Sequence, residues 1–307
     1  MSAPPAKRGN PLLPRLGAVV VAGLVAAAAA RGSGCVLGRG LRAGTFNIRC
    51  FGNEPTDMDR LAAIVEATGS DVLAIQEVQS EKAAHDLARR LSKGSRRYTF
   101  TQSSCGGRSL MHLGFLYDAS RVSLVSTKEY PELDPEGGGS CSAGERPGLA
   151  GLFERNGKRF HLLAVHLAAG GEKEKMERRR IQWKRAHAIA ASLRVSAPVA
   201  ILGDTNSTGF LDDKGGERTF IEEEAKKNSL DVSTRGLGCS EYFAPASAGQ
   251  LIPSLLDHVV VSPELARPRT ARVHGYCEEL ACAPTKHKPG DYVRVSDHCP
   301  VTFDLAQ

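Results

Sequence analysis

Several apolar runs of this sequence end in, or lie next to, polar side chains that could bind a metal ion or a phosphate. Each has an ordinary structural explanation, such as a turn at Gly203–Asn206 or a solvated glutamate at Glu77. Burying a carboxylate or an imidazole is costly unless the group is paired or bound to metal. The repeated pattern therefore indicates that these groups gather in one site. They are Asn47, Glu77, His166, Asp204, Asn206, Asp257, Asp297 and His298.

The composition of this set indicates phosphoester chemistry assisted by a hard metal ion. Carboxylate and amide oxygens suit Mg²⁺, Mn²⁺ or Ca²⁺, and no Cys/His spacing is typical of structural zinc. The chain has neither a GxxxxGK[ST] phosphate loop nor a GxSxG nucleophile elbow. Two histidines with carboxylate partners fit general acid–base catalysis, and a metal ion could stabilise the extra charge of a pentacovalent phosphorus.

The elements that must position these groups are predicted by apolar runs alternating with helical patterns. Helical spacing of apolar residues predicts helices over 58–69, 81–94 and about 172–194. Asn156-Gly157 is typical of a hairpin turn. Because strands occur both between helices and in runs, we expect a layered α/β protein with mixed or antiparallel sheets. The predicted strands are 41–49, 71–78, 112–118, 122–127, 148–154, 159–167, 199–204, 254–262 and 297–305, with an irregular glycine-rich stretch before 254–262.

The N-terminus has the pattern of an export signal. Three positive charges precede the uncharged apolar run Leu16–Ala30, which is typical of a secretory signal peptide cleaved near Ala30. A lipoprotein leader ending at Cys35 and an uncleaved membrane anchor are the alternatives. We therefore expect residues 1–30 to be a signal peptide and the protein to be exported, periplasmic or extracellular, or else membrane-anchored.

Charge and cysteine content fit this location. The formal net charge is +6, but three of the positive charges lie in the leader, so binding of phosphates is expected from local basic patches. Eight cysteines suit an oxidising compartment. Their connectivity cannot be deduced from spacing alone. From loop composition and proximity we expect the pairs Cys105–Cys141 and Cys277–Cys282.

The predicted helix 172–194 carries a dense run of basic residues, for which two interpretations stay open. The basic side chains could form a nucleic-acid-binding face. Glu174 and Arg178 have the i,i+4 spacing typical of a solvated helix, however, and we favour that interpretation. The basic residues are Lys173, Lys175, Arg178, Arg179, Arg180, Lys184 and Arg185.

Seven segments, in order along the chain, resemble motifs of the endonuclease/exonuclease/phosphatase superfamily and, within it, of the deoxyribonuclease I branch. They are TFNIRCFG, LAIQEV, ERPG, AVHL, GDTN, LDHVVV and SDHCPV, and they span about residues 45–301. The resemblance implies a single domain over 41–307 with a four-layer α/β/β/α sandwich, in which helices face two central mixed or antiparallel sheets. It also implies an active site at one edge of the sandwich.

The resemblance further implies a divalent metal site and contacts to a phosphate. Asn47, Glu77 and Asp297 would approach the metal ion, which would be Mg²⁺, with Mn²⁺ or Ca²⁺ as alternatives. Arg49 and Arg146 match positions that contact the substrate phosphate in the nuclease branch, and an arginine fork suits phosphate oxygens.

Catalytic roles follow from the same resemblance. Asp204 and Asn206 would orient the attacking water and the phosphoryl oxygens. His166 and His298 would flank the scissile phosphate as general acid, general base or charge stabiliser. Asp257 would hold His166 in its working orientation, as a carboxylate partner fixes a histidine tautomer.

Three positions depart from the nuclease branch. That branch has an acidic residue just before the strand matching 112–118, and this residue pairs with a catalytic histidine; here Met111 and His112 occupy the region. Gln79 replaces an arginine that contacts DNA, and Thr205 replaces the aromatic residue of the usual GDFN motif. These departures bear more on DNA as substrate than on phosphodiester hydrolysis.

The function expected from the sequence is a secreted, divalent-metal-dependent phosphodiesterase, specifically an endonuclease. It would hydrolyse DNA, with RNA as an alternative substrate, by in-line attack of water on phosphorus. Nucleic acid is then a substrate, no stable protein partner is implied, and a monomer is expected. A lipid phosphodiesterase, a sugar-phosphate phosphatase and a non-catalytic binding module are the alternatives.

Overall fold

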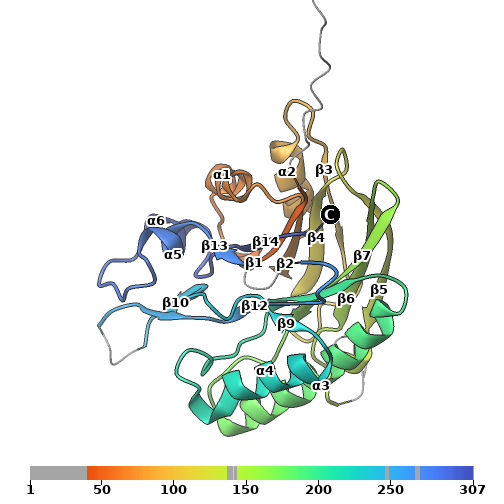
Figure 1. Ribbon diagram of the computed structural model, residues 1–307. Helices are drawn as coiled ribbons and strands as arrows, with labels where there is room; N and C mark the ends of the chain where they lie inside the picture. The colour runs from red at the N-terminus through yellow and green to blue at the C-terminus, as the bar shows by residue number, and fades with distance from the viewer. Residues whose placement is uncertain (1–39, 137–140, 142–143, 246–248, 267–269, 307) are drawn as a thin grey trace, which may run out of the picture. The chain divides into compact units, whose positions relative to one another are not determined.

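Two six-stranded sheets stack face to face in the described part of the chain, and helices cover the outer face of each (Figure 1). The computed structural model describes residues 40–136, 141, 144–245, 249–266 and 270–306, all within the unit Arg39–Gln307. The expected four-layer α/β/β/α sandwich is confirmed. Cys35 and the leader predicted over 1–30 lie outside the described residues.

The first sheet has the strand order β13-β14-β1-β2-β4-β3. The central pair β1–β2 is parallel, and the other neighbouring strands are antiparallel. Parallel strands end at the same edge of a sheet, so Asn47 of β1 and Glu77 of β2 lie near one edge. The strands are β1 Arg42–Phe51, β2 Val72–Val78, β3 Tyr98–Gln102, β4 His112–Asp118, β13 Arg272–Val273 and β14 Val301–Asp304.

The second sheet has the order β5-β6-β7-β8-β12-β9, and its parallel pair is β7–β8. Asn156 and Gly157, both with positive φ, connect β6 to β7, which confirms the predicted hairpin turn. A separate short pair is formed by β10 and β11. The strands are β5 Ser123–Tyr130, β6 Gly148–Arg155, β7 Lys158–His166, β8 Val199–Asp204, β9 Asp231–Val232, β10 Glu241–Phe243, β11 Ile252–Ser254 and β12 Asp257–Val261.

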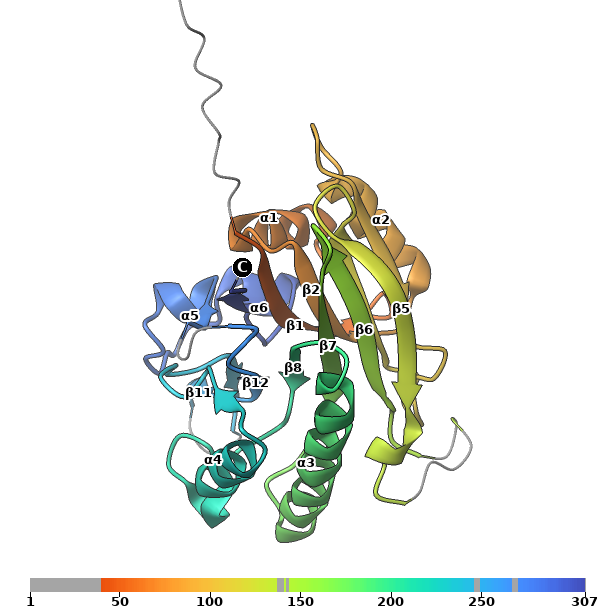
Figure 2. The same cartoon turned by 45° about the vertical axis from the view of Figure 1, so that its right-hand side comes forward.

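Helices α1 and α2 cover the first sheet, and α3 and α4 lie side by side on the second (Figures 1 and 2). The Asp57 side chain accepts a hydrogen bond from the Arg60 amide at the start of α1, and Gly69 ends this helix with φ 63°. No helix of the described residues is long and apolar enough to cross a membrane. The helices are α1 Met58–Thr68, α2 Glu81–Leu91, α3 Lys173–Arg194, α4 Glu217–Lys227, α5 Tyr276–Glu279, α6 Gly290–Arg294 and the short 3₁₀ segments Pro131–Leu133 and Lys214–Gly216.

Strand β7 shows how the layers share the core. Leu162 and Ala164 pack between the two sheets, whereas Leu163 and Val165 pack in the cluster that includes Trp183 of α3. Successive side chains of a strand point to opposite faces, so a strand covered on both faces is apolar throughout.

The disulfides partly match the prediction. Cys105–Cys141 is confirmed. Cys277–Cys282 is wrong, because Cys277 bonds Cys299 and Cys282 bonds Cys239. Cys277 belongs to α5 and is fully buried, whereas Cys282 follows the helix and packs near Gly238. The turn of the helix therefore directs two cysteines that are close in sequence to different partners.

Two arginines in the basic run of α3 are engaged in ion pairs within the protein. Arg179 is fully buried, and its guanidinium lies 3.1 Å from the Glu217 carboxylate. Arg178 pairs with Asp134 at 3.2 Å and with Glu136 at 2.7 Å. These two arginines hold α3 to neighbouring segments and are not free to bind a nucleic acid.

Candidate active site

The polar strand ends of both sheets meet around the side-chain amide of Asn47. Its Nδ2 donates to Glu77 Oε1 and to Asp204 Oδ2, each at 2.9 Å. Glu77 belongs to the first sheet and Asp204 to the second, so this buried amide joins the two sheets at the site. Asn47 Oδ1 is buried without a hydrogen-bond partner, which leaves it available to a ligand.

Glu77 has a strained backbone. Its φ is 63°, in the left-handed region that non-glycine residues rarely adopt. The register of β2 with β4 shifts between Ile75 and Val78, which brackets this residue. The Glu77 carboxylate is held at both oxygens, since Cys50 N donates to Oε2 at 2.9 Å while Oε1 accepts from Asn47.

The Gly203–Asn206 segment is a turn, and the turn fixes Asp204. A Cβ at Gly203 would lie 1.9 Å from Val165 O, so only glycine allows β8 to approach β7 this closely. Asn206 has φ 52°, and its amide N donates to Asp204 Oδ1 at 2.9 Å. The Asn206 side chain donates to Leu167 O at 3.1 Å. Asp204 is thereby aligned beside His166, its register partner in β7.

Asp257 orients His298, not His166 as the resemblance implied. Asp257 Oδ2 lies 2.9 Å from His298 Nδ1 and also accepts from Ser240 Oγ at 2.7 Å. Burial alone would lower the pKa of His298, but the charges of Asp257 and Asp204 raise it well above its usual value. These charges favour the imidazolium form of His298, whose Nε2 lies 3.7 Å from Asp204 Oδ2.

His166 has an arginine as its partner. His166 Nδ1 lies 3.0 Å from Arg146 Nη1, and a guanidinium can only donate. Nδ1 therefore accepts, and the ring proton is on Nε2, 3.3 Å from Asp204 Oδ2. Burial, with the positive charges of Arg146 and His298, lowers the pKa of His166 well below its usual value. His166 is a neutral imidazole that donates toward Asp204.

Asp204 lies between these two histidines. Burial raises the pKa of its carboxyl to about 7; the His298 charge lowers it and the Asp257 charge raises it. A carboxylate of this basicity, held by its neighbours in one orientation, can accept a proton from water near neutral pH.

A metal ion fits the donor set at these strand ends. Glu77, His166 and Asp204 bring possible ligand atoms within 4.8 Å of one another. Both ring nitrogens of His166 are engaged, by Arg146 and by Asp204, so the oxygens of Glu77 and Asp204 and the unpartnered Asn47 Oδ1 are the donors left for an ion. These donors are oxygens, as hard divalent cations prefer. Asp297, predicted as a ligand, is half-buried beside His298 in the chain and outside this group of three.

Two other residues bear on the predicted site. The Arg49 guanidinium pairs with Glu54, its Nε donating to Glu54 Oε2 at 3.1 Å, and the Arg49 backbone N donates to Ser296 Oγ at 3.4 Å. Glu241 of β10 was not predicted, although its isolated bridge with His298 brings it to the site. Its sequence signal, a single acid in a three-residue strand, is too weak to single out.

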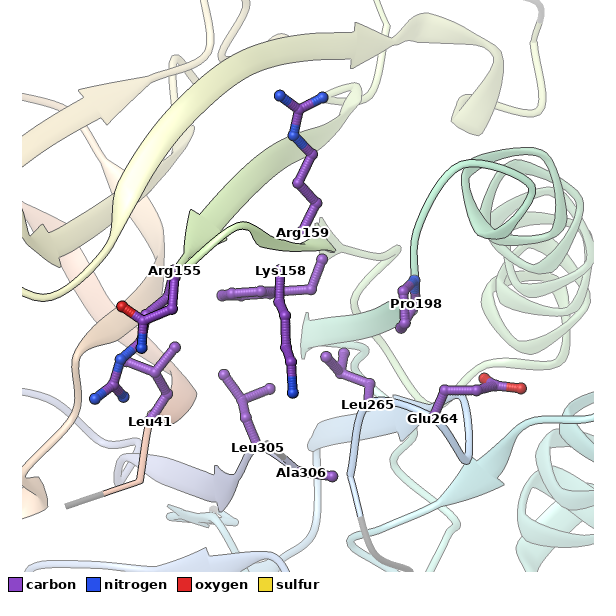
Figure 3. Close-up of a pocket in the computed structure, with 11 residues that line it drawn as sticks. Leu41, Arg155, Lys158, Arg159, Pro198, Glu264, Leu265, Leu305 and Ala306 are labelled. Carbon is purple, nitrogen blue, oxygen red and sulfur yellow. The ribbon is translucent and has the colours of Figure 1, made fainter. Parts of the chain in front are cut away.

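A pocket of about 260 Å³ lies at the other end of β7 (Figure 3). Lys158, the first residue of β7, extends between Leu265 and Leu305 there, whereas His166 is the last residue of the strand. The described residues that line this pocket include none of the predicted site residues. The predicted site residues therefore lie away from this pocket.

Comparison with known families agrees with this geometry. The sequence profile of the Endonuclease/Exonuclease/phosphatase family matches residues 44–298. The chain belongs to this family. No curated protein sequence matches the chain significantly.

Solved structures of this family share the fold at low sequence identity. A mannosyl-6-phosphatase of Bacteroides thetaiotaomicron is 17% identical, with TM-score 0.57, over 87% of this chain and all (100%) of that one. D. rerio TDP2, solved with a single-strand DNA product, is 15% identical, with TM-score 0.58, over 87% and 99%. The human Nocturnin catalytic domain, with bound sulfate, is 15% identical, with TM-score 0.58, over 87% and 93%. Such identities establish the fold and leave the substrate open.

Proposed function

We propose that this protein is an exported, divalent-metal-dependent phosphodiesterase that acts as an endonuclease on DNA, with RNA as an alternative substrate. The observation that carries the proposal is the buried Asp204 carboxylate between a neutral His166 and a charged His298. This arrangement offers a base for water and a cation for a phosphoryl oxygen within one small site. Membership of the family supports hydrolysis of a phosphoester.

Asp204 would accept a proton from the attacking water, and the His166 Nε2–H would hold that carboxylate in position. The imidazolium of His298 would donate to a non-bridging oxygen of the phosphate and stabilise the charge that develops there. Because His298 Nε2 and Asp204 Oδ2 are 3.7 Å apart, both address the same side of phosphorus. His298 is then a charge stabiliser rather than the acid for a leaving oxygen on the far side.

Glu77 and Asn47 are the residues that would hold the divalent ion, which we propose to be Mg²⁺ or, alternatively, Mn²⁺ or Ca²⁺. When bound, the ion would supply Lewis-acid stabilisation of the phosphate and of the leaving 3′ oxygen. Arg146 is half-buried beside His166. It would contact the phosphate through the guanidinium N–H groups that do not donate to His166. Asp297 and Arg49 would act from the rim.

Export is supported by three disulfides, which are typical of secreted proteins. We propose that a signal peptide over residues 1–30 directs this export, with anchoring through this segment or through Cys35 as alternatives. We also propose that the enzyme works as a monomer with nucleic acid as its substrate. Mass spectrometry of the mature N-terminus and light scattering would test these points.

A sugar-phosphate phosphatase is the second candidate. One structure with the same fold is a mannosyl-6-phosphatase, and Gln79 replaces an arginine that contacts DNA in the nuclease branch. Gln79 here donates to Ser109 O at 3.0 Å, so it serves the loop rather than a substrate.

A substrate panel tests the proposal. The full chain would be assayed on supercoiled plasmid, RNA, sphingomyelin and a hexose 6-phosphate, with Mg²⁺, Mn²⁺ or EDTA. We expect metal-dependent nicking of plasmid that is lost in His166→Ala and Asp204→Ala and kept in the exposed control Asp212→Asn. If the protein hydrolysed only the hexose 6-phosphate or only sphingomyelin, that activity would replace the proposed nuclease activity. No turnover of any substrate, with metal bound, would indicate a binding module.

A further inference from the structure

The pocket at the start of β7 opens onto the end of the core that lies between the two sheets. Four of its lining residues belong to this core, and each is at most 7% exposed. They are Leu41, Phe160, Leu265 and Leu305. Two of them adjoin strands of the first sheet, and two belong to or follow strands of the second. The apolar part of a ligand placed here would therefore continue the packing of the core.

Backbone hydrogen bonds hold this apolar floor in place. Leu305 N donates to Leu41 O at 2.9 Å, and Ala306 N donates to Leu265 O at 2.6 Å, which ties the end of the first sheet to the segment after β12. Because these walls are already fixed, a ligand would not have to order them on binding. The volume of the pocket is about 260 Å³, below the roughly 300–1,000 Å³ of sites for drug-sized ligands. The pocket therefore suits a single short chain.

Lys158 supplies a positive charge beside this floor. Its side chain extends between Leu265 and Leu305, as Figure 3 shows. In the part of the chain that the structure describes, no carboxylate pairs with its ammonium. The described lining contains one carboxylate, that of Glu264, and this group pairs with Arg194 at 2.7 Å. An ammonium beside apolar side chains, with no carboxylate of the protein to pair with, can bind the head of an amphiphilic anion.

We propose that this pocket binds a medium-chain aliphatic carboxylate, whose chain packs against the floor and whose carboxylate pairs with Lys158. Arg155 and Arg159 of the β6–β7 hairpin also line the pocket. Both interact within the protein, Arg159 with Glu154 at 2.7 Å, but their charges make the rim positive and favour an anion. One ammonium matches a single negative charge, which favours a carboxylate over a phosphate monoester. This inference does not rest on the proposed function.

Isothermal titration calorimetry of the metal-free full chain with sodium octanoate tests the proposal. We expect one site, with binding about 10-fold tighter than that of hexanoate, because the two further methylenes are buried. Octanol, which lacks the charge, should bind about 10-fold more weakly than octanoate. Lys158→Met keeps the length of the side chain and removes its charge, so it should weaken octanoate binding about 10-fold and leave octanol binding unchanged. Lys286→Met replaces an exposed lysine outside the pocket and is the matched control.

Three results would overturn the inference: no binding of octanoate to the wild type, an affinity that does not change with chain length, or wild-type affinity in Lys158→Met. Lys158→Arg retains the charge and should retain binding, and circular dichroism would show that the variants are folded. His166→Ala should bind octanoate as the wild type does; loss of binding there would place the ligand at the candidate active site instead. The proposed function fails separately, through a protein that binds octanoate as expected and cleaves no phosphoester.

Discussion

Asp204 shows how two histidines of one site acquire opposite charge states. Burial and then the positive charge of Arg146 lower the pKa of His166, whereas the charges of Asp257 and Asp204 outweigh burial and raise the pKa of His298. Environments that drive the pKa values of neighbouring groups apart are a means of assigning different roles to similar side chains. The site thus pairs one neutral donor with one cation around a single base.

Removing the Arg146 guanidinium should raise the pKa of His166. In Arg146→Met the burial that lowers this pKa remains, but the neighbouring positive charge is lost. NMR titration of the imidazole resonances in metal-free protein, assigned with His166→Gln, would measure the shift. Arg155→Met, at the far end of β6, is the control and should leave His166 unchanged. An unchanged His166 pKa in Arg146→Met would contradict the assigned partner.

Asp257→Asn should impair His298 and spare His166. Loss of the Asp257 charge lowers the pKa of His298, since that charge is the main cause that raises it. We expect kcat to fall by about 100-fold or more with little change in KM. Ser240→Ala removes the other hydrogen bond to Asp257 Oδ2 but keeps the charge, so its loss should be smaller. Equal losses in both variants would show that geometry, not charge, is what Asp257 supplies.

At the scale of elements, helices and strands with a strong hydrophobic periodicity could be predicted from the sequence, and those with a weak periodicity could not. The long apolar strands such as β7 and β8 and the helix α3 were predicted close to their observed bounds. Helix α4, within the stretch expected to be irregular, was missed because its buried apolar residues are only Ile221 and Ala225. Strand β10 is too short for any alternation, and it forms through pairing with β11.

The same limit applies to the candidate site. Strand-end acids and histidines could be selected from the sequence, because polar groups after apolar runs stand out. The pairing of these groups could not be predicted. Asp257 reaches His298 because β12 pairs in register with β8 and because His298 forms a bridge with β10. Tertiary geometry of this kind leaves no periodic signal in the chain.

Strand β12 contains a histidine that should make stability depend on pH. Burial lowers the pKa of His258 from 6.5 to about 4. Between pH 6.5 and pH 4 the unfolded chain therefore binds a proton at this histidine that the folded chain does not bind. The free energy of unfolding decreases as the pH falls through this range. This residue alone should cost about 2 kcal/mol between pH 7 and pH 5.

Urea unfolding at the two pH values measures this loss. His258→Gln should show a smaller drop than the wild type, even if it is less stable at pH 7, because it cannot bind the proton. His85→Gln, an exposed substitution on α2, should show the wild-type drop. Equal drops in all three proteins would assign the pH dependence to other buried histidines.

At the scale of the whole molecule, two disulfides hold the segment that completes the site. Cys239–Cys282 and Cys277–Cys299 close loops of sequence separation 43 and 22 around the region that carries Glu241, Asp257, Asp297 and His298. Strands β1 and β2 of the first sheet and β7 and β8 of the second supply most of the remaining site residues. The site therefore depends on this segment being held against both sheets.

Replacing Cys239 and Cys282 by serine should lower the free energy of unfolding by about 4 kcal/mol, as expected for a closed loop of this length. The loosened segment should also lower kcat, because it carries both His298 and its partner Asp257. Urea unfolding and steady-state kinetics under non-reducing conditions measure both effects. The control is replacement of Cys105 and Cys141 by serine, which removes a disulfide outside this segment and should lower the free energy of unfolding alone. Peptide mapping that recovered a Cys277–Cys282 linkage from the native protein would refute the observed connectivity, and with it the reason for expecting the two losses to occur together.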